Sequence, residues 1–179
     1  MAAWISLIAT ALGALIAFSG NTLSEGMKSR REQSRSQLET QRQVTVEFIL
    51  AADNVHGLLR QVGMQSLEAL ELRTAAREAV GNSGIYGTRE KLLISAPPEV
   101  AVAAEAEFHA LIGIRDAVEN GAKPGSPSYD EAYNAWAETV WTVRQVAREA
   151  FGVSRLNLNK INKIEADRLE KRSSKSDSS

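Results

Sequence analysis

The stretch 44–70 reads VTVEFILAADNVHGLLRQVGMQSLEAL, and its apolar side chains recur every three to five residues. The members of this stripe are Val44, Phe48, Ala52, Val55, Leu59, Val62, Leu67 and Leu70. That spacing is close to the 3.6-residue period of an α-helix and is typical of an amphipathic helix with one buried face. Ala75, Ala76 and Val80 extend the stripe towards Gly81. We therefore predict one long helix from residue 44 to residue 80.

The stretch after this helix carries turn residues. Three glycines, with Asn82 and Ser83, predict a loop over residues 81–88, and Thr88 is a candidate cap for a short element ending at Ser95. The apolar run 92–94 is too short to assign by periodicity. We favour a helical turn over a lone strand, because the sequence offers no evident partner strand.

Two further long helices follow. The first is predicted to begin at Pro97 and Pro98 and to end at a Gly121 cap, and its apolar stripe is Val100, Ala104, Phe108, Leu111, Ile114 and Val118. The second is predicted to begin either at Ser126 before Pro127 or at the capping box of Ser128 and Glu131. Its stripe is Tyr133, Trp136, Val140, Val143, Ala147 and Ala150, and it stops near Gly152. Trp136 and Val140 are expected to be buried against the preceding helix.

These elements predict an all-α protein with an antiparallel helical bundle of three long helices and a short fourth element. The expected divisions are a transmembrane anchor (1–24), a juxtamembrane helical stalk (25–43), the bundle (44–152), a short amphipathic helix (153–170) and a disordered tail (171–179). Whether the stalk continues the anchor as one helix is left open by the sequence.

The anchor is predicted from an uncharged N-terminal run. Residues 2–23 are rich in Ala, Leu and Ile, and the first charged side chain is Glu25. As a helix the run would be roughly 33 Å long, which is enough to cross the hydrocarbon core of a bilayer. A cleaved signal peptide would need positive charge before the apolar run, and none is present. A buried core helix is the other alternative.

The orientation is predicted from the basic residues that follow the run. These are Lys28, Arg30, Arg31 and Arg35, and Lys and Arg next to a span stay on the cytoplasmic side. We expect a single-pass cell-membrane protein with its N-terminus outside and its C-terminal domain in the cytoplasm.

The run also carries small residues at four-residue spacing. Ala9, Gly13 and Ala17 would share one face of the helix, and such a face lets two helices approach closely in lipid. The spacing indicates a possible homo-oligomer, although an Ala-rich helix also shows it by composition alone.

Composition excludes several classes of site. The 179-residue chain has no cysteine, so disulfides, thiolate zinc sites and cysteine nucleophiles are excluded. Its net charge of −1 gives no electrostatic match to nucleic acid. Each of the two histidines follows a carboxylate at helical spacing, as Asp53–His56 and Glu105–His109, but these pairs do not repeat the ligand pattern of di-metal bundles. We expect no catalytic site, cofactor or metal.

Two segments carry a resemblance to a known group. One is the run 92–94 with Pro97, Pro98 and the Ala-rich helix from Glu99, and the other leads from residues 125–129 to Ala150, Phe151 and Gly152. With the anchor and the Arg-rich stalk, they resemble uncharacterised small single-pass membrane proteins of actinobacteria. The layout is also similar to LemA-type proteins and to the ATP synthase b subunit, but the latter keeps one uninterrupted helix. The resemblance implies an anchored helical protein and assigns no functional residue.

Two functions remain open from the sequence. The first is a non-enzymatic, membrane-tethered helical scaffold at the inner face of the membrane, whose protein partner the sequence does not identify. The alternative is a ligand-responsive membrane effector that self-assembles through its transmembrane helix.

Overall fold

The computed structural model describes the backbone of residues 2–154 and the side chains of residues 30–154. Its elements are α1 (Ala2–Gly63), α2 (Ala69–Gly81), α3 (Ile85–Ser95), α4 (Pro98–Glu119) and α5 (Pro127–Ala150). The predicted all-α fold class is confirmed, because residues 2–154 contain helices and no strand. The predicted tail (171–179) and most of the predicted helix (153–170) lie outside the described residues, and Val153 and Ser154 are not helical.

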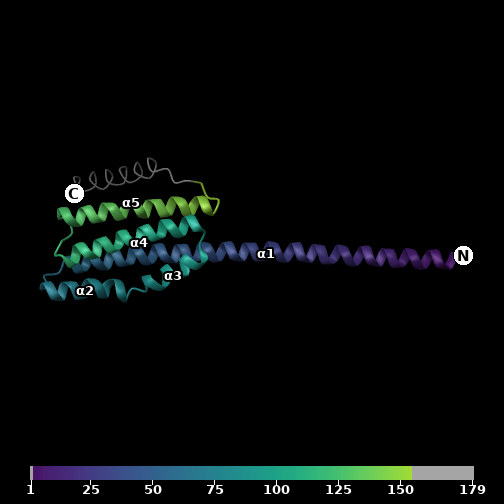
Figure 1. The fold of residues 1–179 in the computed structure, drawn as a ribbon, viewed down its shortest axis with the longest axis horizontal. Coiled ribbons are helices and arrows are strands. Elements are labelled where there is room, and N and C mark those ends of the chain that lie inside the picture. Colours follow the sequence, from purple (N-terminus) through teal and green to yellow (C-terminus); the bar gives the residue numbers. More distant parts are fainter. Residues whose placement is uncertain (1, 155–179) are drawn as a thin grey trace, which may run out of the picture.

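The helices form a bundle in which successive legs alternate in direction (Figure 1). The C-terminal part of α1 enters the bundle, and α2 and α3 together return along it as a second leg. α4 then runs in the direction of α1, and α5 runs back beside α4. α4 packs against α1, α2 and α5, so it is the central helix of the bundle. The bundle therefore has three long helices and two short ones, where the sequence predicted one short element.

α1 continues far beyond the bundle without interruption (Figure 1). Its 62 residues correspond to roughly 93 Å of helix. The side chains of residues 30–40 are exposed, and from residue 30 onward the first buried side chains are Val44 and Thr45. The predicted stalk is therefore helical and continuous with the N-terminal segment.

Within the described residues, no helix combines the length and the apolar character that crossing a bilayer requires. The side chains of residues 1–29 lie outside those residues. The predicted anchor (1–24) therefore stays a prediction.

The core consists of the faces that the periodic stripes predicted. Its fully buried large side chains include Phe48, Val55 and Leu59 from α1, Leu111, Ile114 and Val118 from α4, and Val143 from α5. Trp136 and Val140 are 5% and 7% exposed and belong to the same cluster, which confirms their predicted burial. Burying one such large apolar side chain contributes about 1.5–3 kcal/mol, so these faces hold the bundle together.

The predicted helix over 44–80 is wrong in its length, because α1 ends at Gly63 and a separate helix begins at Ala69. A β-carbon at Gly63 would lie 3.1 Å from Pro124 Cδ, so the α4–α5 connection packs closely against the end of α1. Glu68 then begins α2 through a capping box with Glu71, a start that the apolar stripe does not reveal. Leu70, which the stripe placed on the buried face, is 77% exposed.

The predicted loop over 81–88 is also too long. Gly84 adopts a φ of 78°, a left-handed conformation that glycine adopts without strain, and α3 begins at the next residue. Ile85 is fully buried, and this burial fixes the start of α3. Thr88 lies inside α3 and donates to Ile85 O at 2.9 Å instead of capping the helix. The helical interpretation of residues 92–94 is confirmed.

The remaining helix ends follow the sequence closely. Pro98 is the first residue of α4, and Gly121 follows its C-cap with a φ of 85°. Ser126 is the N-cap of α5 and Pro127 its first residue, so the alternative start at Ser128 is wrong. Gly152 follows the end of α5 with a φ of 69°.

Candidate functional site

A groove runs along the seam between α1 and α5, and we call it the α1/α5 groove. It consists of three hollows in a row. The distal hollow (about 260 Å³) is lined by His56, Arg60, Tyr129 and Tyr133, and the central hollow (about 330 Å³) by Asp53, His56, Trp136 and Arg144. The stalk-end hollow (about 510 Å³) is lined by Arg42, Val46, Ile49, Arg144, Arg148 and Phe151. Neighbouring hollows share residues, so together they extend over the whole α1–α5 seam.

The groove exists because α4 holds α1 and α5 apart. α4 packs extensively on both helices, whereas the backbones of α1 and α5 hardly approach each other. Long side chains reach across the remaining gap. The α1/α5 seam is consequently the open side of the bundle, and the residues that line it come from α1, from α5 and from the segments that flank α5.

An aromatic cluster separates the distal hollow from the central one. The His56 ring stacks on Trp136 with centroids 4.4 Å apart and lies 5.3 Å from the ring of Tyr133. Tyr129 Oη lies 3.4 Å from His56 Nε2. Burial lowers the pKa of His56, the nearby Arg60 lowers it further, and Asp53 opposes the shift. The neutral imidazole is therefore favoured at neutral pH.

An ion pair separates the central hollow from the stalk-end hollow. Arg144 Nη2 of α5 donates to Asp53 Oδ2 of α1 at 3.2 Å, and both side chains are about two-fifths exposed. At that exposure the pair contributes little to stability, typically 0–1 kcal/mol. Its main effect is to bridge the two helices and divide the groove.

Glu107 lies in the core of the bundle. Its side chain is fully buried on α4, and neither carboxylate oxygen has a hydrogen-bond partner among the described residues. Burial raises the pKa of Glu107 to about 7, and the charge of Asp53 adds to this rise while Arg144 opposes it. An unpaired carboxylate in a core is costly, so Glu107 is an ionisable group whose charge opposes folding near neutral pH.

The stalk-end hollow combines apolar walls with basic side chains. Arg42 Nη2 donates to Phe151 O at 3.0 Å, and its guanidinium carbon lies 5.7 Å from the centre of the Phe151 ring. Arg148 Nε donates to Ser154 O at 2.7 Å. Both guanidinium groups thus bond to backbone carbonyls of the segment that follows α5. Neither has a carboxylate partner within the part of the chain that the structure describes.

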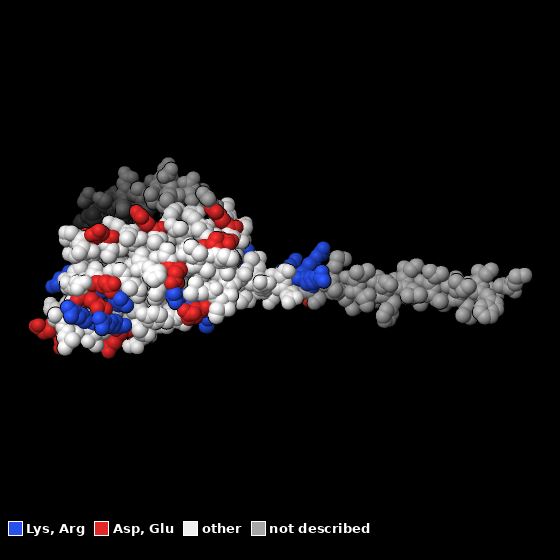
Figure 2. All heavy atoms as spheres, in the orientation of Figure 1, with Lys and Arg blue, Asp and Glu red and all other residues white. Residues whose placement is uncertain are grey.

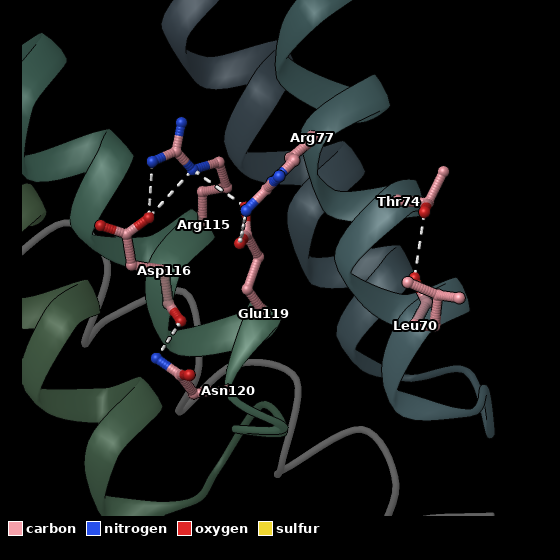
Figure 3. Close-up of polar contacts among 7 residues, drawn as sticks. All are labelled: Leu70, Thr74, Arg77, Arg115, Asp116, Glu119 and Asn120. Carbon is pink, nitrogen blue, oxygen red and sulfur yellow. Dashed lines mark hydrogen bonds and ion pairs between the residues drawn. The ribbon is translucent and has the colours of Figure 1, made fainter.

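A second polar cluster ties Arg77 of α2 to the C-terminal end of α4 (Figure 3). Glu119 accepts hydrogen bonds from Arg77 Nε and Nη2, each at 3.1 Å, and forms an ion pair with Arg115 at 3.3 Å. Arg115 also donates to Asp116 at 2.6 Å. These charges satisfy one another, so the cluster is a structural tie between two helices.

The two predicted carboxylate–histidine pairs are separate in the fold. Asp53 and His56 lie in the groove, whereas Glu105 bonds to Arg89 at 2.7 Å and to His109 at 3.1 Å on another face. Among the residues described, no three His, Asp or Glu side chains form a group suited to a metal ion.

The predicted topology and self-association residues are only partly described. Arg30, Arg31 and Arg35 are exposed on the stalk, where Figure 2 shows a group of basic side chains. The side chains of Lys28 and of Ala9, Gly13 and Ala17 lie outside the described residues. The predicted self-association face therefore stays a prediction.

Sequence reasoning missed Glu107 and the groove. Glu107 lies three residues after Ala104 and four before Leu111, both in the predicted stripe, so its spacing alone marks a charged residue at a core position. No sequence pattern indicated the groove, because the groove depends on the distance between α1 and α5 in the folded bundle.

No family model matches the chain, and neither the curated proteins nor the solved structures contain a match to it. The resemblance to small single-pass membrane proteins of actinobacteria therefore stays a prediction.

Proposed function

We propose that this chain is a non-enzymatic, membrane-anchored interaction module that presents a helical bundle at the inner face of the cell membrane. One observation carries the proposal. α1 is a single helix that joins the uncharged N-terminal run to the bundle core, with no flexible linker between them. A continuous helix of this kind holds a domain at a fixed distance from its anchor.

The length of the stalk sets that distance. From Leu23, the end of the apolar run, to Val44, the first of the described side chains to be buried, the helix rises roughly 32 Å. The bundle would stand clear of the lipid headgroups, and its groove would remain accessible to a cytoplasmic protein.

The groove supports interaction over catalysis. Its lining is mainly aromatic, apolar and basic, with Asp53 and Asp130 as the acidic residues among those described, and Asp53 already forms an ion pair with Arg144. Aromatic residues and arginine are the residue types enriched at the centres of protein interfaces.

The topology can be tested with a single introduced cysteine. We expect Ser176→Cys to resist an impermeant thiol reagent in intact cells and to react after lysis, because the chain has no other cysteine and its basic stalk should stay inside. The measurement is labelling of the full chain by mass shift on a gel. Labelling in intact cells would overturn the cytoplasmic orientation, and recovery of the chain in the soluble fraction would overturn the anchor.

The alternative function is a ligand-responsive effector that self-assembles through the N-terminal segment. The observation that favours it is Glu107, a buried carboxylate without a partner whose ionisation opposes the packed state of the bundle. A bundle with such a group can change its packing when a bound cation or proton neutralises the charge.

Self-association through the segment is tested at the centre of its small-residue face. If that face is the contact, Gly13→Ile should abolish dimerisation, because a branched side chain would separate the two backbones. Leu15→Ile, which lies off the face, should leave dimerisation unchanged. The measurement is a membrane dimerisation reporter, and we expect weak association at most in the wild type. Equal association of all three chains would assign the contact to the cytoplasmic bundle.

A further inference from the structure

We propose that the α1/α5 groove binds one amphipathic helix of a protein partner, with apolar side chains on its inner face and carboxylates beside the stalk-end hollow. The inference rests on the proposed role as an interaction module and specifies the chemistry of the partner.

The length and the division of the groove favour a helix. Its lining on α1 runs from Arg42 to Arg60, which corresponds to roughly 27 Å or an 18-residue partner helix. The Asp53–Arg144 pair and the His56–Trp136 stack divide this length into separate hollows. A single acyl chain would have to cross the ion pair, whereas a helix can insert separate side chains on successive turns into separate hollows.

The charge of the stalk-end hollow specifies carboxylates. Arg42, Arg144 and Arg148 line it, and none of its lining residues is acidic. Arg42 and Arg148 bond only to the backbone carbonyls of Phe151 and Ser154 within the described residues, so each keeps N–H donors for a partner. Guanidinium groups of this kind bind carboxylates through charge-assisted hydrogen bonds.

Exposed apolar side chains supply the rest of the contact. Val46 is 54% exposed and Val153 is 41% exposed at the stalk end, and Tyr133 is 39% exposed at the distal end. A partner helix with an apolar stripe would cover all three. The aromatic residues of the central hollow are held in place by their stacking, so little ordering entropy opposes binding there.

Site-specific photocrosslinking in the full chain, in its native membrane, tests the proposal. A photoreactive benzophenone amino acid replaces Val46 in the groove, and in a matched control it replaces Val102, which is 72% exposed on α4 outside the groove. The crosslinked segment is identified by mass spectrometry. We expect a crosslink from position 46 alone, to a segment with apolar residues at three- and four-residue spacing flanked by Asp or Glu.

Charge variants decide whether the basic residues select that segment. The double variant Arg42→Glu, Arg148→Glu should reduce the crosslink yield by roughly tenfold, because like charges would then face each other. The matched variant Arg42→Lys, Arg148→Lys should keep most of the yield. Circular dichroism of both variants checks that they fold equally, and a Glu variant that loses helicity is replaced by Arg148→Gln alone, for which a several-fold reduction is expected.

Every other result overturns the inference. Such results are a crosslink to lipid, to residues 155–179 of the same chain or to a second copy, equal yield in the Glu and Lys variants, or no crosslink from position 46. The proposed membrane anchoring is tested separately by the Ser176→Cys labelling. A chain that is anchored yet gives no crosslink therefore refutes the groove inference and leaves the anchoring intact.

Discussion

Trp136→Ala should lower the free energy of unfolding of the bundle by about 3–5 kcal/mol, the range typical for truncation of a buried tryptophan. Trp136 is only 5% exposed and stacks on His56 across the α1–α5 seam, so the change would leave a cavity and break the main aromatic contact between these helices. Because a domain is stable by only about 5–15 kcal/mol, the loss would be a large share of the total. Urea unfolding of residues 30–179, followed by circular dichroism, measures it.

Two control variants separate packing from other causes. Trp136→Phe keeps an aromatic ring and removes an indole N–H that has no hydrogen-bond partner among the described residues, so it should cost less than half as much. Ile94→Ala changes a side chain that is 83% exposed and should alter stability by no more than about 0.5 kcal/mol. A loss below about 1 kcal/mol for Trp136→Ala would be close to the effect of a surface substitution and would contradict the packing of α5 described above.

Glu107→Leu should raise the free energy of unfolding at pH 8 by about 3 kcal/mol, which is the cost of ionising a carboxyl whose pKa rises from 4.5 to about 7 on folding. The side chain is fully buried without a partner, and Leu fills a similar volume without a charge. Replacing buried charge by a well-packed apolar side chain is often stabilising. Urea unfolding of the wild type and the variant, compared at each pH, measures the difference.

The pH dependence of that difference has a defined sign. Between pH 4.5 and about 7 the unfolded chain has lost the Glu107 proton while the folded chain retains it, so wild-type stability falls as the pH rises. Above about pH 7 both states are ionised, and the contribution of Glu107 becomes constant. His56, whose pKa is lowered on folding, contributes the opposite slope below its ordinary value of 6.5 and is common to both chains.

A third variant tests the charge itself. Glu107→Gln should also remove the slope but stabilise less than Leu, since a buried amide without partners still costs about 1–3 kcal/mol. A difference between wild type and Glu107→Leu that does not change between about pH 5 and about pH 8, which lie on either side of the folded-state pKa of about 7, would show that Glu107 does not titrate in a buried site.

Much of the core followed from local patterns. The stripes that contain Phe48, Leu111 and Val143 identified buried faces because a helix repeats every 3.6 residues whatever its neighbours are. The ends at Pro98 and Gly121 were also predictable, since proline lacks the N–H that the first turn leaves unpaired and glycine adopts the left-handed conformation after the last turn.

The candidate site was much less accessible from the sequence. The Asp53–His56 spacing correctly placed both residues on one side of a helix, but nothing local indicated that Arg144, Trp136 and Tyr133 would meet them from α5. The burial of Glu107 likewise arises because α4 is the central helix of the bundle. The apolar stripe of α4 does not specify that position.

The sequence by itself determined that this protein is helical, which faces of its helices are buried and where α4 begins and ends, because those properties depend on side chains within a few residues of one another. Only the tertiary structure decided that α1 ends at Gly63, where the chain packs against Pro124, and that α1 and α5 stand apart to form a groove. The physical reason is that these features arise from contacts between segments far apart in the chain, and the packing of α4 against both partners fixes them.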